Sequence, residues 1–77
     1  MQRNIIGVAL KNIRLKRQPP ITQNDLAARL QILGWKITRF GISKIERGER
    51  KVTDKEILLL SQALNVSVQE LFQEIDL

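Results

Sequence analysis

The sequence predicts an all-α fold, a compact bundle of five short helices. One start signal recurs four times: an apolar residue, then Thr or Ser, then a second apolar residue four positions after the Thr or Ser. The hydroxyl can accept hydrogen bonds from the free N–H groups of a first helical turn, and the two apolar residues can close as a hydrophobic staple. Between these signals, Leu and Ile recur at helical spacing. The four signals lie at Thr22, Thr38, Thr53 and Ser67.

The first two helices are bounded by proline and glycine. The first is expected over about residues 4–17, where Pro19-Pro20 ends it, because the residue before a proline disfavours the helical conformation. The second is expected to begin after Thr22 and to run to Leu33, with Gly34 as a natural stop. The apolar faces are Ile6, Leu10 and Ile13 in the first helix, and Leu26, Ala27, Leu30 and Leu33 in the second.

The capping signals of the other helices differ in completeness. Thr53 and Ser67 each have a glutamate three residues later, Glu56 and Glu70, which completes a capping box. After Thr22, Asp25 is a shorter substitute, and after Thr38 the equivalent position is a glycine, Gly41. Gly48 should end the third helix, and Asn65 can take the left-handed conformation that ends the fourth. The apolar positions are Ile42 and Ile45; then Ile57, Leu60 and Leu64, with Leu58 in support; and last Leu71, Phe72 and Ile75.

Positive charge is concentrated in the first two-thirds of the chain. The 77 residues are expected to form a single domain, 1–77, with a net charge of +5. Residues 1–51 hold 12 Lys and Arg against 3 Asp and Glu, a balance of +9, whereas residues 52–77 have a balance of −4. A chain divided in this way can present a positive face to a polyanion, although basic small domains are also common without that function.

The composition argues against catalysis and against a bound metal. Without Cys or His there is no thiol nucleophile, no usual proton carrier near neutral pH and no usual nitrogen ligand for zinc. The carboxylates of Asp54 and Glu56 fit the first turn of a helix better than acid–base chemistry. We expect no enzyme activity, cofactor, metal or small-molecule ligand. Lys11, Asn12 and Arg14 interrupt the N-terminal apolar run, so we expect neither a signal peptide nor a membrane span, and a cytoplasmic protein.

The helix expected over about 38–47 has two unlike faces. At about 100° per residue, Ile42 and Ile45 fall on one side. A charged helix of this width fits the major groove of DNA, although most charged helix faces are only solvated. Phe40 argues against simple solvation unless its ring turns inward and joins the core. The residues on the other side are Arg39, Phe40, Ser43, Lys44 and Arg47.

Three stretches, "TQNDLAARL", "ISKIERGERKVTD" and "LLLSQALNVSVQELF", resemble the helix-turn-helix regulators of phage repressor/Cro type, the xenobiotic-response-element family. The resemblance covers about residues 10–72 and implies a lambda-repressor-like bundle that binds operator DNA. It implies a phosphate contact for Gln23 and, less strongly, a backbone contact for Asn24. The positions that it places near bases or phosphates are Arg39, Phe40, Ser43 and Lys44.

The resemblance has one departure. The stretch "LQILGWKIT" makes the usual tight turn about five residues longer, and residues 34–36 would bridge a longer second helix to Thr38. Trp35 is then either a core plug over this turn or an exposed contact to a partner or DNA.

An ion pair is expected to hold the 38–47 helix in place. On the helical wheel Glu46 falls between the apolar edge and the basic face, toward the first helix. The resembled family pairs this glutamate with an arginine of the first helix, and Arg14 matches that position. We expect an Arg14–Glu46 ion pair that is at least half buried.

The sequence thus favours a sequence-specific transcriptional regulator that binds double-stranded DNA. An antitoxin-like or adaptor module on the same fold is the alternative. Because one helix reads only a few base pairs, we expect a homodimer through the C-terminal helix. Its apolar surface would come from Phe72, Ile75 and Leu77.

Overall fold

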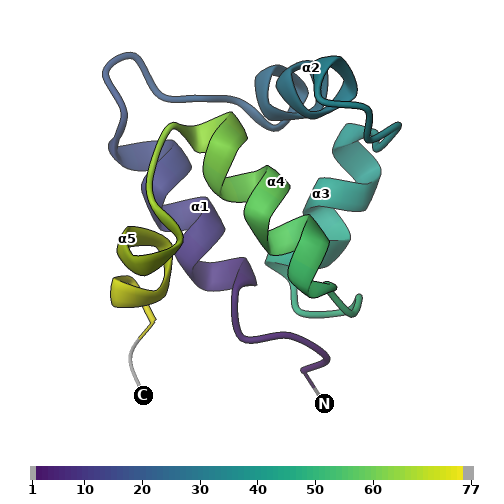
Figure 1. The fold of residues 1–77 in the computed structure, drawn as a ribbon, viewed down its shortest axis with the longest axis vertical. Helices are drawn as coiled ribbons and strands as arrows, with labels where there is room; N and C mark the ends of the chain where they lie inside the picture. Colours follow the sequence, from purple (N-terminus) through teal and green to yellow (C-terminus); the bar gives the residue numbers. More distant parts are fainter. Residues whose placement is uncertain (1, 76–77) are drawn as a thin grey trace.

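The computed structural model describes residues 2–75, which form five α-helices joined by short connections (Figure 1). α4 lies at the centre of the view, with α1 and α5 to its left, α2 above it and α3 to its right (Figure 1). The predicted all-α bundle of five helices is therefore confirmed. No helix within residues 2–75 is long and apolar enough to cross a membrane. The helices are α1 (Gly7–Lys16), α2 (Gln23–Ile32), α3 (Arg39–Glu46), α4 (Asp54–Leu64) and α5 (Val68–Gln73).

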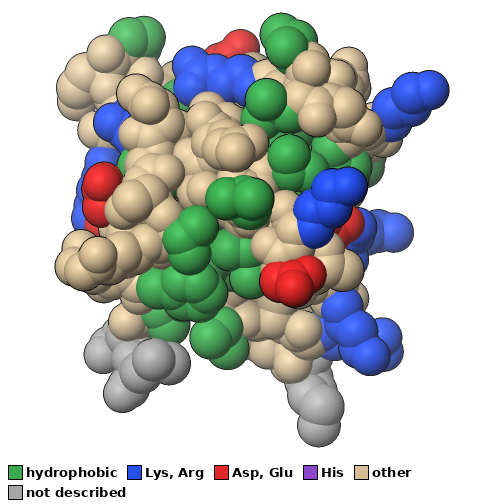
Figure 2. All heavy atoms as spheres, viewed as in Figure 1, with side chains coloured by type: hydrophobic (Ala, Val, Ile, Leu, Met, Phe, Trp, Pro, Cys, Tyr) green, Lys and Arg blue, Asp and Glu red, His purple; other side chains and the backbone are tan. Residues whose placement is uncertain are grey.

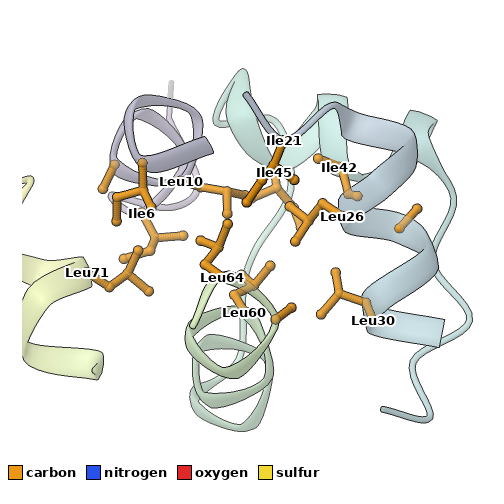
Figure 3. Close-up of a cluster of buried hydrophobic side chains, with 14 of the residues drawn as sticks. Ile6, Leu10, Ile21, Leu26, Leu30, Ile42, Ile45, Leu60, Leu64 and Leu71 are labelled. Carbon is orange, nitrogen blue, oxygen red and sulfur yellow. The ribbon is translucent and has the colours of Figure 1, made fainter. Parts of the chain in front are cut away.

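An aliphatic core joins all five helices (Figure 3). Two isoleucines from the connections, Ile21 and Ile37, are buried with it, each directly before a predicted helix start. Burying one such side chain stabilises the fold by about 1.5–3 kcal/mol relative to leaving it exposed. The largest fully buried side chains are Ile6, Leu10, Leu26, Leu30, Ile42, Ile45, Leu60, Leu64 and Leu71.

Two leucines expected on apolar helix faces are exposed instead. Leu33 is 41% exposed, because α2 ends at Ile32 and the chain turns away from the core at the next residue. Leu58 is 49% exposed, because it lies about 200° around α4 from the fully buried Leu60. A run of four large apolar residues, 57–60, circles the helix, so only part of it can face the core.

Three of the four predicted caps are confirmed. The hydroxyl of Thr22 accepts a hydrogen bond from the N–H of Asp25 at 3.0 Å, and the Asp25 carboxylate accepts one in return from the N–H of Thr22 at 3.1 Å. The short aspartate therefore completes the box, as the glutamates do after Thr53 and Ser67. The predicted cap at Thr38 is wrong: its hydroxyl makes no capping hydrogen bond, and Gly41 offers no side chain to complete a box.

The helices α2, α3 and α4 end with the same hydrogen-bond pattern. After α3, the N–H of Gly48 donates to the carbonyl of Ile45 and the N–H of Glu49 donates to that of Lys44, both at 2.9 Å. This pattern requires one residue with positive φ, which favours glycine and tolerates asparagine. The predicted stops are confirmed, with φ of 97° at Gly34, 73° at Gly48 and 57° at Asn65.

The first helix is shorter than the predicted 4–17. The structure begins α1 at Gly7 because Oδ1 of Asn4 accepts hydrogen bonds from the N–H groups of Ile6, at 3.1 Å, and Gly7, at 2.8 Å. An asparagine that turns the backbone in this way stands before the helix, not inside it. At the other end, α1 stops at Lys16 and the chain becomes extended.

Candidate nucleic-acid interface

The inner and outer sides of α3 differ sharply. Ile42 and Ile45 have no solvent exposure, and they hold the inner side against the core. On the outer side Arg39, Lys44 and Arg47 are exposed and Ser43 is partly buried at the edge. Phe40 is 66% exposed, so its ring does not turn inward to join the core.

An open groove of about 340 Å³ runs beside the start of α3. Its walls come from α2 and from the first turn of α3. The guanidinium carbon of Arg39 lies 4.8 Å from the centre of the Phe40 ring, a cation–π contact. The groove is lined by Asn24, Ala27, Ala28, Gln31, Thr38, Arg39 and Phe40.

Arg14 and Glu46 form the ion pair that was expected from the sequence. Nε of Arg14 donates to Oε2 of Glu46 and Nη2 donates to Oε1, both at 2.9 Å. The two side chains are 8% and 4% exposed, so the pair is almost completely buried. The planar guanidinium suits this two-point contact, and its Nη1 donates to the carbonyl of Ile21 at 2.9 Å. The pair therefore ties α1 and the α1–α2 connection to the end of α3.

The family model for the helix-turn-helix matches residues 10–71. This chain belongs to the helix-turn-helix family. It is of Cro/C1 type, a family of DNA-binding regulatory domains that are not typically enzymatic. Comparisons with curated proteins and with solved structures gave no significant match. In the helix-turn-helix arrangement α2 and α3 are the paired helices, and α3 occupies the place of the recognition helix.

The two α2 residues expected to contact the DNA backbone differ in their surroundings. Asn24 is exposed and lines the groove beside α3. Gln23 is partly buried, and its Nε2 donates to Oε1 of Glu46 at 3.0 Å. In this helix-turn-helix protein the Gln23 side chain therefore supports the ion pair, and the second N–H of its amide remains available to another acceptor.

Two arginines near the end of α3 have different surroundings. Arg47 pairs with Glu49 at 2.8 Å, and both side chains are more than half exposed. An exposed pair contributes only about 0–1 kcal/mol, so a phosphate can readily replace Glu49. Arg50 pairs with Glu56 at 2.9 Å, and its guanidinium carbon lies 5.4 Å from the centre of the Trp35 ring.

The lengthened turn of the helix-turn-helix is held from both sides. Trp35 is partly buried and packs against the core, as the core-plug interpretation predicts. The N–H of Trp35 donates to the carbonyl of Leu30 at 2.9 Å. Nε2 of Gln31, near the end of α2, donates to the carbonyl of Ile37 just before α3, at 3.0 Å. These bonds determine where α3 begins relative to α2.

Sequence reasoning missed two residues that position the end of α3. Nδ2 of Asn4 donates to the carbonyls of Ile45, at 3.1 Å, and Arg50, at 2.7 Å. A Cβ atom added at Gly7 would collide with the carbonyl oxygen of Ile45 and lie 3.0 Å from Cα of Glu46. α1 thus approaches α3 as closely as a glycine allows. Only an asparagine followed three residues later by glycine marks this contact in the sequence.

The carboxylates of α4 have structural partners. Glu56 accepts hydrogen bonds from Arg50 and from the N–H of Thr53, and the hydrogen bond from Arg50 is the main reason why the pKa of Glu56 is lowered. Asp54 accepts a bond from the N–H of Lys55 at 2.8 Å. Within residues 2–75 no three side chains of metal-binding type gather.

Proposed function

We propose that this protein is a sequence-specific transcriptional regulator that binds double-stranded DNA with α3 in the major groove. The observation that carries the proposal is the division of α3 into two sides. Its inner side is held by the core and by the buried Arg14–Glu46 pair, whereas its outer side presents three cations and a ring to solvent. A rigid helix with this outer face suits the groove, where base edges offer acceptors to Arg and Lys.

The side chains of the proposed interface come from α3 and from the start of α2. Arg39, Lys44 and Ser43 are proposed to reach base edges or nearby phosphates, because they lie on the outer side of α3. Arg47 is proposed to contact phosphate after leaving its exposed pair with Glu49. At the start of α2, Asn24 and Gln23 are proposed to contact the DNA backbone. Exposure supports this role for Asn24, and for Gln23 it requires the amide N–H that Glu46 does not use.

A homodimer would supply the length of site that one α3 cannot read. We place the contact at α5, where Phe72 is 38% exposed. Ile75 packs partly against the core and contributes less than expected, and Leu77 lies outside the described residues. Figure 2 shows apolar side chains gathering in the region between α5 and α4. Leu58 of α4 is also exposed. A two-fold dimer would set the two copies of α3 about 34 Å apart, on successive turns of one DNA face.

Selection of bound sites from a randomised duplex pool tests this function. The expected result is a defined inverted repeat, bound with an affinity that falls steeply as salt rises, because neutralised phosphates release counterions. Binding at micromolar strength or weaker at low salt, with no sequence preference, would overturn the proposal. A single asymmetric half-site saturated by one monomer would overturn the dimer but not the regulator.

One observation favours the second candidate, an antitoxin-like or adaptor module. Val8 and Leu15 on α1 are 57% and 50% exposed, and they lie about 20° apart around the helix. This apolar stripe is on α1, not on the outer side of α3, so it can serve a protein partner. Failure of the duplex selection would favour this reading.

A further inference from the structure

Phe40 occupies a position that the fold does not explain. Its side chain is 66% exposed, and it lies about 140° and 160° around α3 from the fully buried Ile45 and Ile42. The ring therefore stands near the middle of the outer side, among Arg39, Lys44 and Arg47. An exposed ring contributes nothing to the core, so its contribution must come from whatever covers α3.

The guanidinium group of Arg39 lies over this ring. Its guanidinium carbon lies 4.8 Å from the centre of the Phe40 ring. Stacking uses the flat face of the guanidinium and leaves its N–H edge free to donate in two parallel hydrogen bonds. The pair therefore presents an apolar surface and a two-point donor side by side, at the edge of the groove between α2 and α3.

We propose that Phe40 recognises the C5-methyl group of a thymine, and that it orients Arg39 toward a guanine beside that thymine. This inference rests on the proposed function and names part of the sequence it reads. The major groove offers hydrogen-bond acceptors and donors and one apolar group, the thymine methyl. A phenyl ring cannot hydrogen-bond, so placing it against polar base edges would leave those edges desolvated and unpaired. Guanine suits Arg39 because its O6 and N7 accept two donors at once.

The charge around the ring favours DNA over a protein partner as its occupant. Arg39, Lys44 and Arg47 surround Phe40 on the outer side of α3. An apolar protein surface that covered the ring would also have to desolvate these cations, whereas DNA supplies phosphates and base acceptors for them. The methyl group is thus recognised within a surface that is otherwise suited to a polyanion.

Replacing thymine by deoxyuridine tests the methyl contact, since it removes only the methyl group. In the duplex obtained by selection, each thymine is replaced singly and the Kd is measured for the full-length protein. At one thymine in each half-site the parent protein should lose about 3- to 5-fold in affinity, the factor for one buried methyl carbon. Phe40→Ala should bind the thymine and deoxyuridine duplexes equally, no better than the parent binds deoxyuridine.

Matched variants and duplexes separate this contact from general effects. Ile32→Ala shortens an apolar side chain that is 85% exposed at the end of α2, and it should keep the full preference for thymine. Phe40→Leu should keep part of that preference. Replacing the thymine–adenine pair by 5-methylcytosine–guanine, compared with cytosine–guanine, shows whether a methylated cytosine also serves. If the 5-methylcytosine duplex binds more tightly than the cytosine duplex, the protein recognises the C5-methyl group on either base. If the two duplexes bind equally, the contact is restricted to thymine.

The role of Phe40 as a positioning residue has its own readout. Arg39→Ala should relax the preference for guanine at the base pair beside the sensitive thymine. Phe40→Ala should relax the same preference for guanine. The double variant should lose little more of that preference than either single variant loses. Additive losses at that base pair would show that Phe40 does not orient Arg39.

The outcomes distinguish this inference from the proposed function. If no duplex is selected, the proposed function fails and the inference fails with it. If a specific site is selected but deoxyuridine is harmless at every thymine, only the recognition of the methyl group is wrong. If Phe40→Ala still discriminates thymine from deoxyuridine, another side chain reads the methyl group. Phe40→Ala should melt like the parent protein, because the ring it removes is 66% exposed and is not part of the buried core.

Discussion

Gln23 donates its amide N–H to Oε1 of Glu46 at 3.0 Å, the same oxygen that accepts a hydrogen bond from Nη2 of Arg14. One buried carboxylate therefore joins the start of α2, the end of α3 and the last turn of α1. In a helix-turn-helix protein the angle between α2 and α3 determines which side chains reach DNA. Glu46, although it lies among basic residues, is turned inward, away from the exposed outer side of α3, and holds this angle.

Removal of Glu46 should destabilise the fold. Glu46→Ala leaves the buried guanidinium of Arg14 without its partner, and stranding one member of a fully buried pair costs about 3–5 kcal/mol. That is a large share of the roughly 5–15 kcal/mol that stabilises a small domain. Urea unfolding should show a much lower midpoint, and DNA binding should be lost as a consequence of unfolding.

Glu49→Ala is the matched control. Glu49 lies three residues further along and pairs with Arg47 at the surface, where a pair contributes only about 0–1 kcal/mol. Its unfolding midpoint should stay close to that of the parent. If Glu46→Ala unfolds like Glu49→Ala, or binds DNA more tightly at unchanged stability, Glu46 is merely a surface charge.

The contact between α1 and α3 should reject any side chain at Gly7. Alanine favours helices over glycine by up to about 1 kcal/mol, so propensity alone predicts that Gly7→Ala is stabilising. The added Cβ would, however, collide with the backbone carbonyl of Ile45, which cannot rotate away as a side chain can. Such overpacking costs about 1–3 kcal/mol or more, so the free energy of unfolding should fall. Asn12→Ala, at an exposed position of α1, should leave stability unchanged or raise it slightly.

Local features of the sequence predicted most of the fold. Caps such as Thr53 with Glu56, and stops such as Gly48, depend on bonds between residues a few positions apart. Thr38 shows the limit of such a signal, because with Gly41 three residues later the hydroxyl alone made no cap. The number of helices and most of the core were predictable for the same reason.

The tertiary contacts of the site were harder to predict from the sequence. Arg14 and Glu46 could be paired only through the family resemblance, since 32 residues separate them. The bond from Asn4 to Ile45 spans 41 residues, and neither helical periodicity nor capping constrains it. Likewise, the bond from Gln23 to Glu46 depends on the angle at which α2 meets α3, which the lengthened turn made uncertain. Such contacts become visible only once the helices are packed.

Stability should depend on Glu56 in acid. Its hydrogen bonds, first of all those from Arg50, lower the pKa of its carboxyl below the usual 4.5. A group with a lowered folded pKa contributes stability that is fully present above its unfolded pKa and is lost as the pH falls through its folded pKa. Unfolding free energies measured from pH 7 down to pH 2 should decrease below about pH 4.5. The Glu56→Gln variant should be less stable at pH 7, and its unfolding free energy should decrease less steeply toward low pH. If this variant shows the same pH dependence as the parent, Glu56 does not contribute to it.

If the proposed dimer forms through α5, a cation in place of Phe72 should favour the monomer. Phe72→Arg places a cation in the proposed apolar contact and should shift sedimentation equilibrium toward the monomer. Because Phe72 is 38% exposed while the neighbouring Leu71 is fully buried, the fold should survive the change. Ile32→Arg, at an 85% exposed site on α2, should leave the association state unaltered. A parent protein that sediments as a monomer at DNA-binding concentrations, on and off DNA, would rule out this contact.

Lys44 should contribute to DNA binding without contributing to the fold. Its side chain is exposed on the outer side of α3, and the core holds the opposite side through Ile42 and Ile45. Lys44→Ala should therefore weaken binding while the melting temperature stays near that of the parent. If Lys44 contacts a phosphate, the slope of log affinity against log salt should become shallower by about 1 per site contacted, since one fewer counterion is released. If it contacts a base instead, the slope should hold and the preference at one base pair should relax. Lys55→Ala, which removes an exposed cation from the first turn of α4, should change neither quantity. Equal behaviour of the two variants in affinity, slope and base preference would mean that DNA does not bind the outer side of α3.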